Sequence, residues 1–483
     1  MVVTLRNAED EGIKPWSDPF ASQQGSGDNE DDEEEELGET NGILSYAEGL
    51  TAITLTDEFA EEYGWKRLQG DLYAEDVKQI MGTVDEDKRQ IPGILTGENE
   101  DPGYSPAPYL SRDLTNNFTD AVSFSTTVLM GAIDPNEEVL QEKLVDENNI
   151  KQALERNLDW LLENQIDTDE GAGWAWIGGS AEKYDKYEKN IKTHNYFTYS
   201  AVIALVDYYD GGLGSSSIPA IEEIRDQRKD EIEDALEKAT EFLLNQWWKK
   251  GRGGNGWALP KRPAEPNAMA SCYAIIALSY LDSKVSDEIE GVNINKDRVN
   301  EGMDYIWGHI NWIQDDPDST LWSEKEGYKC RLGNQMEEEY LDGSGPYLYL
   351  DTVYEFLNYG AGDIEALDAD EEELREWADE FAKKILLKCW AGEKGFIDKG
   401  FRHLGLPEEA RDNPYDNPTA LYTTNVGIET FLTNVLWDPD EEETVIYEKA
   451  DQDKETEKTK EQAAPTKQNN TTQTVQADPR KRL

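Results

Sequence analysis

The sequence predicts an all-α fold of the α/α-toroid class, in which helical hairpins form an inner and an outer ring of helices. Two observations predict it. Two kinds of helix alternate along the chain, and the connection between them repeats an unusual sequence motif, which we call the repeated phrase. A helix that is apolar on all sides has to be buried on all sides, so such helices are expected in the inner ring. The repeat, roughly 65 to 80 residues, is longer than that of TPR or HEAT units.

The predicted outer helices are amphipathic. In the first of them Ile150, Leu154, Leu158 and Leu161 recur at helical spacing, and the opposite face is charged. Segments 231–247, 298–314 and 373–390 have the same pattern. Each is expected to turn its apolar face toward the inner ring and its charged face toward solvent.

The predicted inner helices are apolar almost all round. They are segments 118–132, 196–209, 269–281, 347–359 and 420–436. A further hairpin is expected from residues 43–65, so the toroid should contain five to six hairpins. An open α-solenoid, which also stacks helical hairpins, is the alternative architecture.

The repeated phrase lies where an outer helix ends. Residues 161–180 read LLENQIDTDEGAGWAWIGGS, and residues 242–263 read FLLNQWWKKGRGGNGWALPKRP. Gln165 and Gln246 are expected to satisfy carbonyls at the helix ends. The glycines are expected to supply positive φ angles; they are Gly171, Gly173, Gly254 and Gly256. Trp174 and Trp257 are then expected to fold over the helix ends as clasps, with exposed stacking platforms as the alternative.

These motifs resemble the QW repeats of squalene–hopene and oxidosqualene cyclases, within the prenyltransferase and squalene-cyclase toroid superfamily. Leu161–Trp174 and Phe242–Trp257 match well, Trp312–Trp322 lacks the glycines, and Leu387–Phe396 keeps only Gly395 and an aromatic residue. The resemblance spans about residues 105–437 and implies the toroid fold. The Asp-x-Asp-Asp acid of class II terpene cyclases and the Asp, Cys and His zinc ligands of protein prenyltransferases are not found in this sequence.

Composition restricts the partners. The formal net charge is −57, from 103 acidic and 46 basic residues. Carboxylates at this density repel one another unless salt screens them, which favours a cytoplasmic protein of a salt-accumulating halophile; an acidic partner-binding surface is the alternative. Such charge argues against nucleic acid as a partner. The sequence contains no apolar run long enough to span a membrane, and it gives no indication of a cofactor.

Three segments are expected along the chain. Residues 1–41 form an acidic segment that should be disordered, residues 42–449 the toroid domain, and residues 450–483 a polar disordered tail. The three cysteines are far apart and the chain has only three histidines, so neither a disulfide framework nor a metal site is expected.

The outer-to-inner loops should meet at one end of the toroid, where a ligand would enter. Candidate ligand-binding residues there are Trp174, Trp176, Tyr196, Trp257, Arg262 and Trp322. Catalytic candidates are His194, Asp169, Glu170 and Asp398. His194 precedes a buried helix, with Asn195 or Thr193 as the expected N-cap, so a purely structural role for this histidine is the alternative.

Three functions follow from these residues. The first is a degenerate, terpenoid-cyclase-like toroid that binds a ligand or a protein partner at its loop-rich mouth. The second is an enzyme that acts on a polyprenyl, terpenoid or polysaccharide substrate in the cavity. The third is a structural subunit of a larger assembly. The lining of the cavity should discriminate them: a deep, aromatic-lined cavity would indicate an isoprenoid, an open acidic cleft a sugar or a basic peptide, and a cavity plugged by side chains a structural subunit.

Overall fold

The fold is all-α, with helices in two layers. The computed structural model describes residues 50, 71–81, 83–84, 90–91, 94–95, 119–133, 145–175, 195–212, 218–251, 254–258, 266, 268–315, 345–359, 371, 373–376 and 378. All of them belong to one compact unit, residues 1–437. The expected disordered segments, 1–41 and 450–483, and the predicted inner helix 420–436 lie outside the described residues, as does nearly all of the hairpin expected from 43–65.

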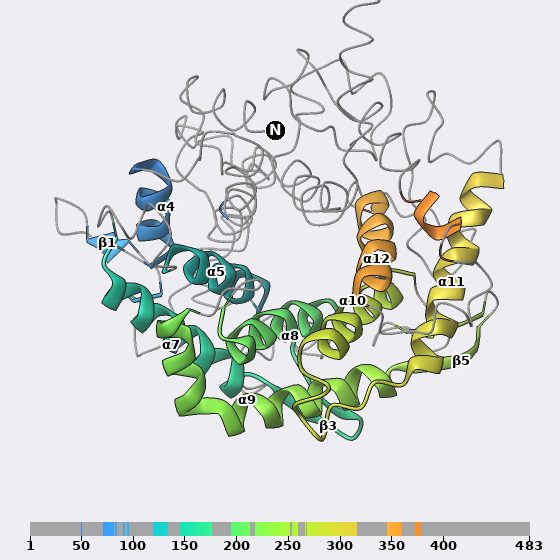
Figure 1. The fold of residues 1–483 in the computed structure, drawn as a ribbon, viewed down its shortest axis with the longest axis horizontal. Helices are drawn as coiled ribbons and strands as arrows, with labels where there is room; N and C mark the ends of the chain where they lie inside the picture. The colour runs from blue at the N-terminus through green and yellow to red at the C-terminus, as the bar shows by residue number, and fades with distance from the viewer. Residues whose placement is uncertain are drawn as a thin grey trace, which may run out of the picture. The chain divides into compact units, whose positions relative to one another are not determined.

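The inner layer consists of α5 (Thr119–Ala132), α8 (Asn195–Asp210), α10 (Ala268–Lys284) and α12 (Gly345–Tyr359), each packed against the next. The outer layer consists of α7 (Glu147–Glu163), α9 (Pro219–Asn245) and α11 (Lys296–Asp315). Figure 1 shows the outer helices on one side of the inner ones. A short helix, α4 (Asp71–Met81), packs against α5 and α7. The predicted alternation of outer and inner helices is therefore confirmed for these elements.

The long helix α9 begins twelve residues earlier than the sequence pattern predicted, at Pro219 rather than Glu231. Proline is favoured in the first turn, because the N–H that it lacks would have no partner inside the helix. Ile221 and Ile224 are buried on the side that also buries Ile232 and Leu236. The apolar face thus continues through a charged stretch that masks it in the sequence.

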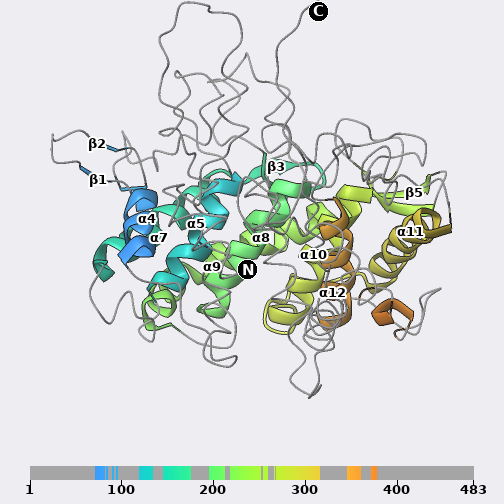
Figure 2. The same ribbon diagram turned by 90° about the horizontal axis from the view of Figure 1, so that it is seen from above.

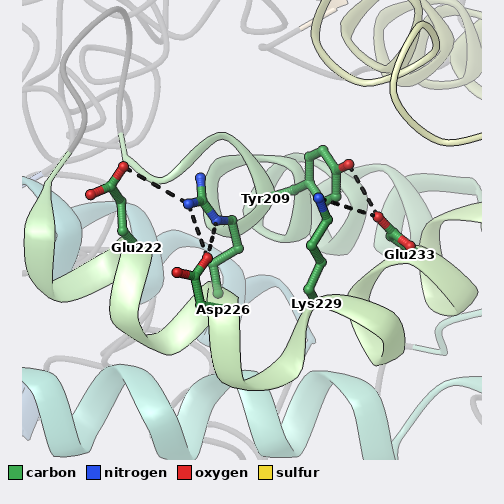
Figure 3. A network of polar contacts seen from close by, with 6 residues as sticks. Tyr209, Glu222, Asp226, Lys229 and Glu233 are labelled. Carbon is green, nitrogen blue, oxygen red and sulfur yellow. Dashed lines mark hydrogen bonds and ion pairs between the residues drawn. The ribbon is translucent and has the colours of Figure 1, made fainter.

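Polar contacts on the helix surfaces join α9 to its neighbours (Figure 3). The Tyr209 hydroxyl at the end of α8 donates to Glu233 at 3.2 Å, and Lys229 lies 5.1 Å from the centre of the Tyr209 ring. Arg225 pairs with Glu222 and Asp226 along α9. Tyr209 is buried, whereas the charged groups are partly or largely exposed, so each ion pair is expected to add little to stability.

The strands in the described part of the chain are three short antiparallel hairpins, two of which are the repeated phrases. β3 (Ile166–Thr168) pairs with β4 (Gly171–Gly173), and β5 (Trp247–Gly251) pairs with β6 (Gly254–Trp257). The third, β1 (Thr83–Val84) with β2 (Gln90–Ile91), follows α4. Figure 2 shows β3 and β5 on the same side of the inner helices. The outer-to-inner loops predicted from the sequence are thus hairpins at one end of the layers.

In the two hairpins of the repeated phrase, a buried tryptophan at or directly after the second strand joins the outer helix to the inner helix. Nε1 of Trp174 donates to the carbonyl oxygen of Leu161 at 2.8 Å, and the backbone N–H of Trp174 donates to Oγ1 of Thr198 at 3.1 Å. Trp257 repeats both bonds, to the Leu243 carbonyl at 2.6 Å and to Oγ of Ser271 at 3.0 Å. Both side chains are fully buried. The predicted clasps are therefore present, with a hydroxyl of the inner helix as an additional partner.

The glutamines of the phrase have a different role from the predicted one. Nε2 of Gln165 donates to the carbonyl oxygen of Ala235 on α9 at 2.8 Å, and Nε2 of Gln246 donates to the Glu170 carboxylate. The glutamines thus link neighbouring repeats. One carbonyl oxygen at each helix end, that of Leu161 or Leu243, accepts from an indole, because a tryptophan that folds back over the last turn brings Nε1 directly to it.

The prediction that the loop glycines supply positive φ angles is correct for Gly171, whose φ is 109°. Gly173 and Gly256 are required for a different reason, namely close packing. A Cβ on Gly173 would lie 2.7 Å from Oγ1 of Thr198, and one on Gly256 would lie 2.8 Å from Oγ of Ser271. These glycines let the strand approach the hydroxyl that its tryptophan N–H needs.

Candidate functional site

Each inner helix has partly exposed residues that its neighbours in the described part of the chain leave uncovered. α8 is covered by α5, α9 and α10, and its partly exposed residues include Tyr196, Tyr199 and Ile203. These positions are three and four residues apart and therefore share one helix face. We call the set of such residues the inner surface; its described members include Phe124, Thr127, Tyr196, Tyr199, Ile203, Met269, Tyr273, Tyr280, Lys284, Asp351 and Glu355.

Tyrosine rings form a continuous cluster on this surface. The Tyr273 ring of α10 lies between two tyrosines of α8, with ring centroids 4.8 Å from Tyr196 and 5.2 Å from Tyr199. All three are partly exposed. Clustered aromatic side chains that keep an exposed edge and a hydroxyl group offer an apolar face for stacking and a polar group for hydrogen bonding. Tyr196, predicted from the sequence as a ligand-binding residue, belongs to this cluster.

Two carboxyl groups lie on the inner surface of α12. Asp351 and Glu355 are one helical turn apart and both are partly exposed. Oε2 of Glu355 is nevertheless enclosed and has no hydrogen-bond partner. Burial and the neighbouring Asp351 carboxylate raise the pKa of Glu355 well above its ordinary value. A carboxyl group in this environment remains protonated at a pH where an ordinary glutamate is ionised.

The Asp351 carboxylate also acts on the neighbouring helix α10. Burial, and to a smaller extent Asp351, raise the pKa of the Cys272 thiol to about 12. Cys272 is fully buried where α10 packs against α12. Tyr273 follows Cys272 directly on α10, and α10 packs against α12. The acidic pair and the Tyr273 ring therefore lie on adjacent helices.

Asn195 does not act as the predicted N-cap of α8. It is the first helical residue and is fully buried, and its Nδ2 donates to the carbonyl oxygen of Ala270 on α10 at 3.4 Å. The amide thus joins two inner helices directly beside the tyrosine cluster. Its Oδ1 has no hydrogen-bond partner.

The other predicted residues at the loop end differ in position. Trp174 and Trp257 are completely buried, which favours the structural interpretation over stacking platforms. Asp169 and Glu170 are exposed at the turn between β3 and β4, where the Glu170 backbone oxygen accepts from Nδ2 of Asn245 at 3.2 Å. His194, Trp176, Arg262, Trp322 and Asp398 lie outside the described residues.

Sequence reasoning overlooked the acidic pair, although a signal was present. The pattern of segment 347–359, YLYLDTVYEFLNY, predicts a helix that is apolar almost all round, yet Asp351 and Glu355 are spaced four residues apart within it. Two acids on one face of an otherwise buried helix indicate a face that is not covered by apolar packing. Tyr199 and Tyr273 were overlooked because tyrosines are common in ordinary cores.

The described part of the chain contains no group of three or more His, Cys, Asp or Glu side chains arranged to hold a metal ion. None of its helices is long and apolar enough to cross a membrane.

Comparison with known proteins gave structural likenesses only. No family model and no curated protein matches the sequence. A family 76 α-mannanase from Bacteroides thetaiotaomicron is 9% identical, covers 81% of this chain and 84% of its own, and has a TM-score of 0.43. A second family 76 enzyme from that species, a mannosidase, is 11% identical, with 83% and 89% covered and a TM-score of 0.43. A family 105 glycoside hydrolase from C. acetobutylicum is 14% identical, with 81% and 94% covered and a TM-score of 0.41. At these values the likeness assigns neither a family nor an activity to this chain.

Proposed function

We propose that the protein binds an oligosaccharide along the inner surface and hydrolyses a glycosidic bond at Asp351 and Glu355. The observation that carries the proposal is the Glu355 carboxyl group, which has an enclosed and unpartnered Oε2 one turn from a second carboxylate. Pairs of acids whose surroundings separate their pKa values are typical of acid–base sites. This is the polysaccharide alternative predicted from the sequence, located on a different set of residues.

The tyrosines support a sugar rather than an isoprenoid as the ligand. Tyr196, Tyr199 and Tyr273 present aromatic edges together with hydroxyl groups, and the acidic pair lies on the next helix. An isoprenoid site would require an apolar lining and would have no use for the two carboxyl groups of α12. A sugar ring offers apolar C–H faces for the aromatic rings and hydroxyl groups for the polar ones.

In the proposed reaction Glu355 gives its proton to the glycosidic oxygen as the bond from that oxygen to the anomeric carbon breaks. Asp351, as a carboxylate, stabilises the positive charge that develops at the anomeric carbon. Water then adds to that carbon and its released proton returns to the carboxyl pair. The reaction needs water as its only co-reactant.

Glu355→Gln and Asp351→Asn test the proposal against gluco-, manno-, xylo- and chito-tetraoses. Wild-type protein should release new reducing ends from at least one of them. Both variants should lose on the order of a thousandfold in kcat, because proton transfer and charge stabilisation each contribute at least a hundredfold. Both should still bind that tetraose in calorimetry. Glu163→Gln on α7, which removes an exposed carboxylate, is the control and should keep full activity.

The outcomes separate two readings of the site. Binding without hydrolysis by wild-type protein would reject the catalytic role and leave a non-catalytic carbohydrate-binding toroid. Failure of all four tetraoses to bind would reject the carbohydrate proposal itself.

A further inference from the structure

Asn195 carries a buried polar atom that has no partner in the fold. Its side chain is completely buried at the start of α8, yet its Oδ1 accepts no hydrogen bond. A buried acceptor without a partner destabilises a protein, because it has lost its bonds to water and gained none in exchange. Such a group in a folded chain calls for an explanation other than stability.

A second buried asparagine shows the contrast. Asn157 on α7 is also completely buried, and its Nδ2 donates to Oγ of Ser125 at 3.3 Å and to Oγ1 of Thr126 at 3.1 Å. Both hydroxyl groups belong to α5. Asn157 therefore joins an outer helix to an inner helix by hydrogen bonds that themselves stabilise the fold.

The amide of Asn195 joins two inner helices at the level of the tyrosine cluster. Its Nδ2 donates to the carbonyl oxygen of Ala270 at 3.4 Å. Tyr196 follows Asn195 directly, and Tyr273 lies about one turn after Ala270 on α10. The bond therefore connects the two helices beside the point where the Tyr196 and Tyr273 rings meet, with centroids 4.8 Å apart. Ala270 lies inside α10, so the helical pattern leaves its carbonyl a partner when the amide is removed.

The contact between α8 and α10 keeps one register along its length. The hydroxyl of Tyr280 donates to Asp207 at 2.7 Å, and Nζ of Lys284 donates to Asp210 at 3.1 Å. The partners are 73 and 74 residues apart in these two pairs, and the Asn195 bond spans 75. Because the offset is nearly constant, the two helices run parallel. Polar contacts join them at their C-terminal ends, and the amide of Asn195 joins them at the end that carries the tyrosine cluster.

We propose that Asn195 is a positioning residue that sets the Tyr196 ring against the Tyr273 ring and thereby shapes the tyrosine face to which a sugar binds. The role rests on the proposed carbohydrate-binding function. Asn195 acts in it through the tyrosines, since its own amide is enclosed and touches no ligand. Contact with an aromatic ring depends on the position and tilt of that ring. A small shift of α8 along α10 therefore weakens binding although the fold remains.

The experiment measures affinity and stability in the same variants. The parent is the full chain carrying Glu355→Gln, which prevents cleavage; binding of gluco-, manno-, xylo- and chito-tetraose is measured by calorimetry, and stability by urea denaturation. Asn195→Ala should bind the tetraose that the parent binds about tenfold more weakly, the value of one well-made contact, while the urea midpoint stays the same or rises. Asn195→Leu, which keeps the branched shape without polar atoms, should behave likewise. Asn157→Ala is the matched control: its urea midpoint should fall and its affinity should equal that of the parent.

A double substitution tests whether Asn195 acts through the tyrosine. Tyr196→Ala in the same parent should itself weaken binding about tenfold. Adding Asn195→Ala to it should weaken binding by less than about twofold more, because the ring that Asn195 positions is already absent. Two losses that simply add would overturn the proposal, since Asn195 would then act on binding by another route.

The remaining outcomes are distinguishable. If Asn195→Ala keeps the affinity of the parent, the positioning role is overturned while the carbohydrate proposal stays in place. A fall of the urea midpoint as large as that of Asn157→Ala would also overturn it, as would loss of the fold in both Asn195 variants by circular dichroism, because Asn195 would then be an ordinary structural residue. If neither wild-type protein nor the parent binds any of the four tetraoses, the proposed function fails and the positioning role fails with it.

Discussion

The indole Nε1 of Trp257 donates a hydrogen bond of 2.6 Å to the carbonyl oxygen of Leu243, in the last turn of the outer helix α9. This bond closes a hairpin back onto the helix that precedes it. One repeat earlier, the indole Nε1 of Trp174 donates the equivalent bond to the carbonyl oxygen of Leu161. Each clasp fixes where the chain turns from the outer to the inner layer, and thereby which face of the inner helix remains uncovered.

Removal of the indole donor should destabilise the fold even when an aromatic ring is retained. Trp257→Phe leaves the Leu243 carbonyl buried without its partner, at a cost of about 1–3 kcal/mol. Trp257→Ala should cost about 3–5 kcal/mol, because a fully buried side chain is lost as well. Urea denaturation measures both. Trp247→Phe is the control, because Nε1 of Trp247 has no hydrogen-bond partner to lose. Equal losses of unfolding free energy in Trp257→Phe and Trp247→Phe would show that the hydrogen bond contributes nothing to stability.

Two glycines of α11 should respond in opposite directions to alanine. A Cβ on Gly302 would overlap the six-membered ring of Trp257, whereas a Cβ on Gly308 would meet nothing within 4 Å. Gly308→Ala should therefore stabilise the protein by about 0.5–1 kcal/mol, the ordinary helix preference for alanine. Gly302→Ala should destabilise it by about 1–3 kcal/mol through overpacking. Thermal melts of the two variants side by side decide the matter, and a stabilising Gly302→Ala would refute the contact.

The stability of the wild-type protein should depend on pH through Glu355. Burial and Asp351 raise the pKa of Glu355 in the folded state, so the folded protein holds a proton that the unfolded chain releases. The stabilising contribution is complete below the ordinary glutamate pKa and is lost as the pH rises through the folded-state pKa. Glu355→Gln, which cannot ionise, should become progressively more stable relative to wild type over that range. Urea denaturation at a series of pH values tests this, with Glu163→Gln as control. A difference in unfolding free energy between Glu355→Gln and wild type that stays constant with pH would contradict it.

Stability should rise with salt. A net charge of −57 places many carboxylates within mutual range on the surface, and their repulsion is screened over about 10 Å at 0.1 M and about 3 Å at 1 M salt. The melting temperature should therefore increase from low to molar KCl. A melting temperature that is flat or falls across the series would remove the argument for a salt-accumulating cell.

Cys272 should resist thiol reagents as long as the protein is folded. The side chain is fully buried and burial raises the pKa of its thiol to about 12, so the reactive thiolate is scarce at neutral pH. In a Cys330→Ser, Cys389→Ser background, labelling by iodoacetamide should be slow in buffer and fast in denaturing urea. Rapid labelling of the folded protein would show that α10 separates from α12 under native conditions.

The sequence by itself determined the helical class, the alternation of outer and inner helices, and the clasps at Trp174 and Trp257. These follow from local patterns: the period of apolar residues sets which face of a helix is buried, and the repeated Gly–Trp phrase marks where an outer helix ends. Even there, the partners of Gln165 and the reason for Gly173 came from the structure, since both involve residues distant in the chain.

Only the tertiary structure decided which surface is open and which side chains meet on it. Tyr196 and Tyr273 are 77 positions apart in the sequence, yet their rings are in contact because α8 packs against α10. Asp351 and Glu355 are visible in the sequence as two acids in an apolar helix. The importance of Glu355 depends on the burial of its Oε2 without a hydrogen-bond partner, and burial is a property of the neighbouring helices rather than of the segment. Local periodicity determines which helices form, whereas packing between helices determines the electrostatic environment of each group and therefore its chemistry.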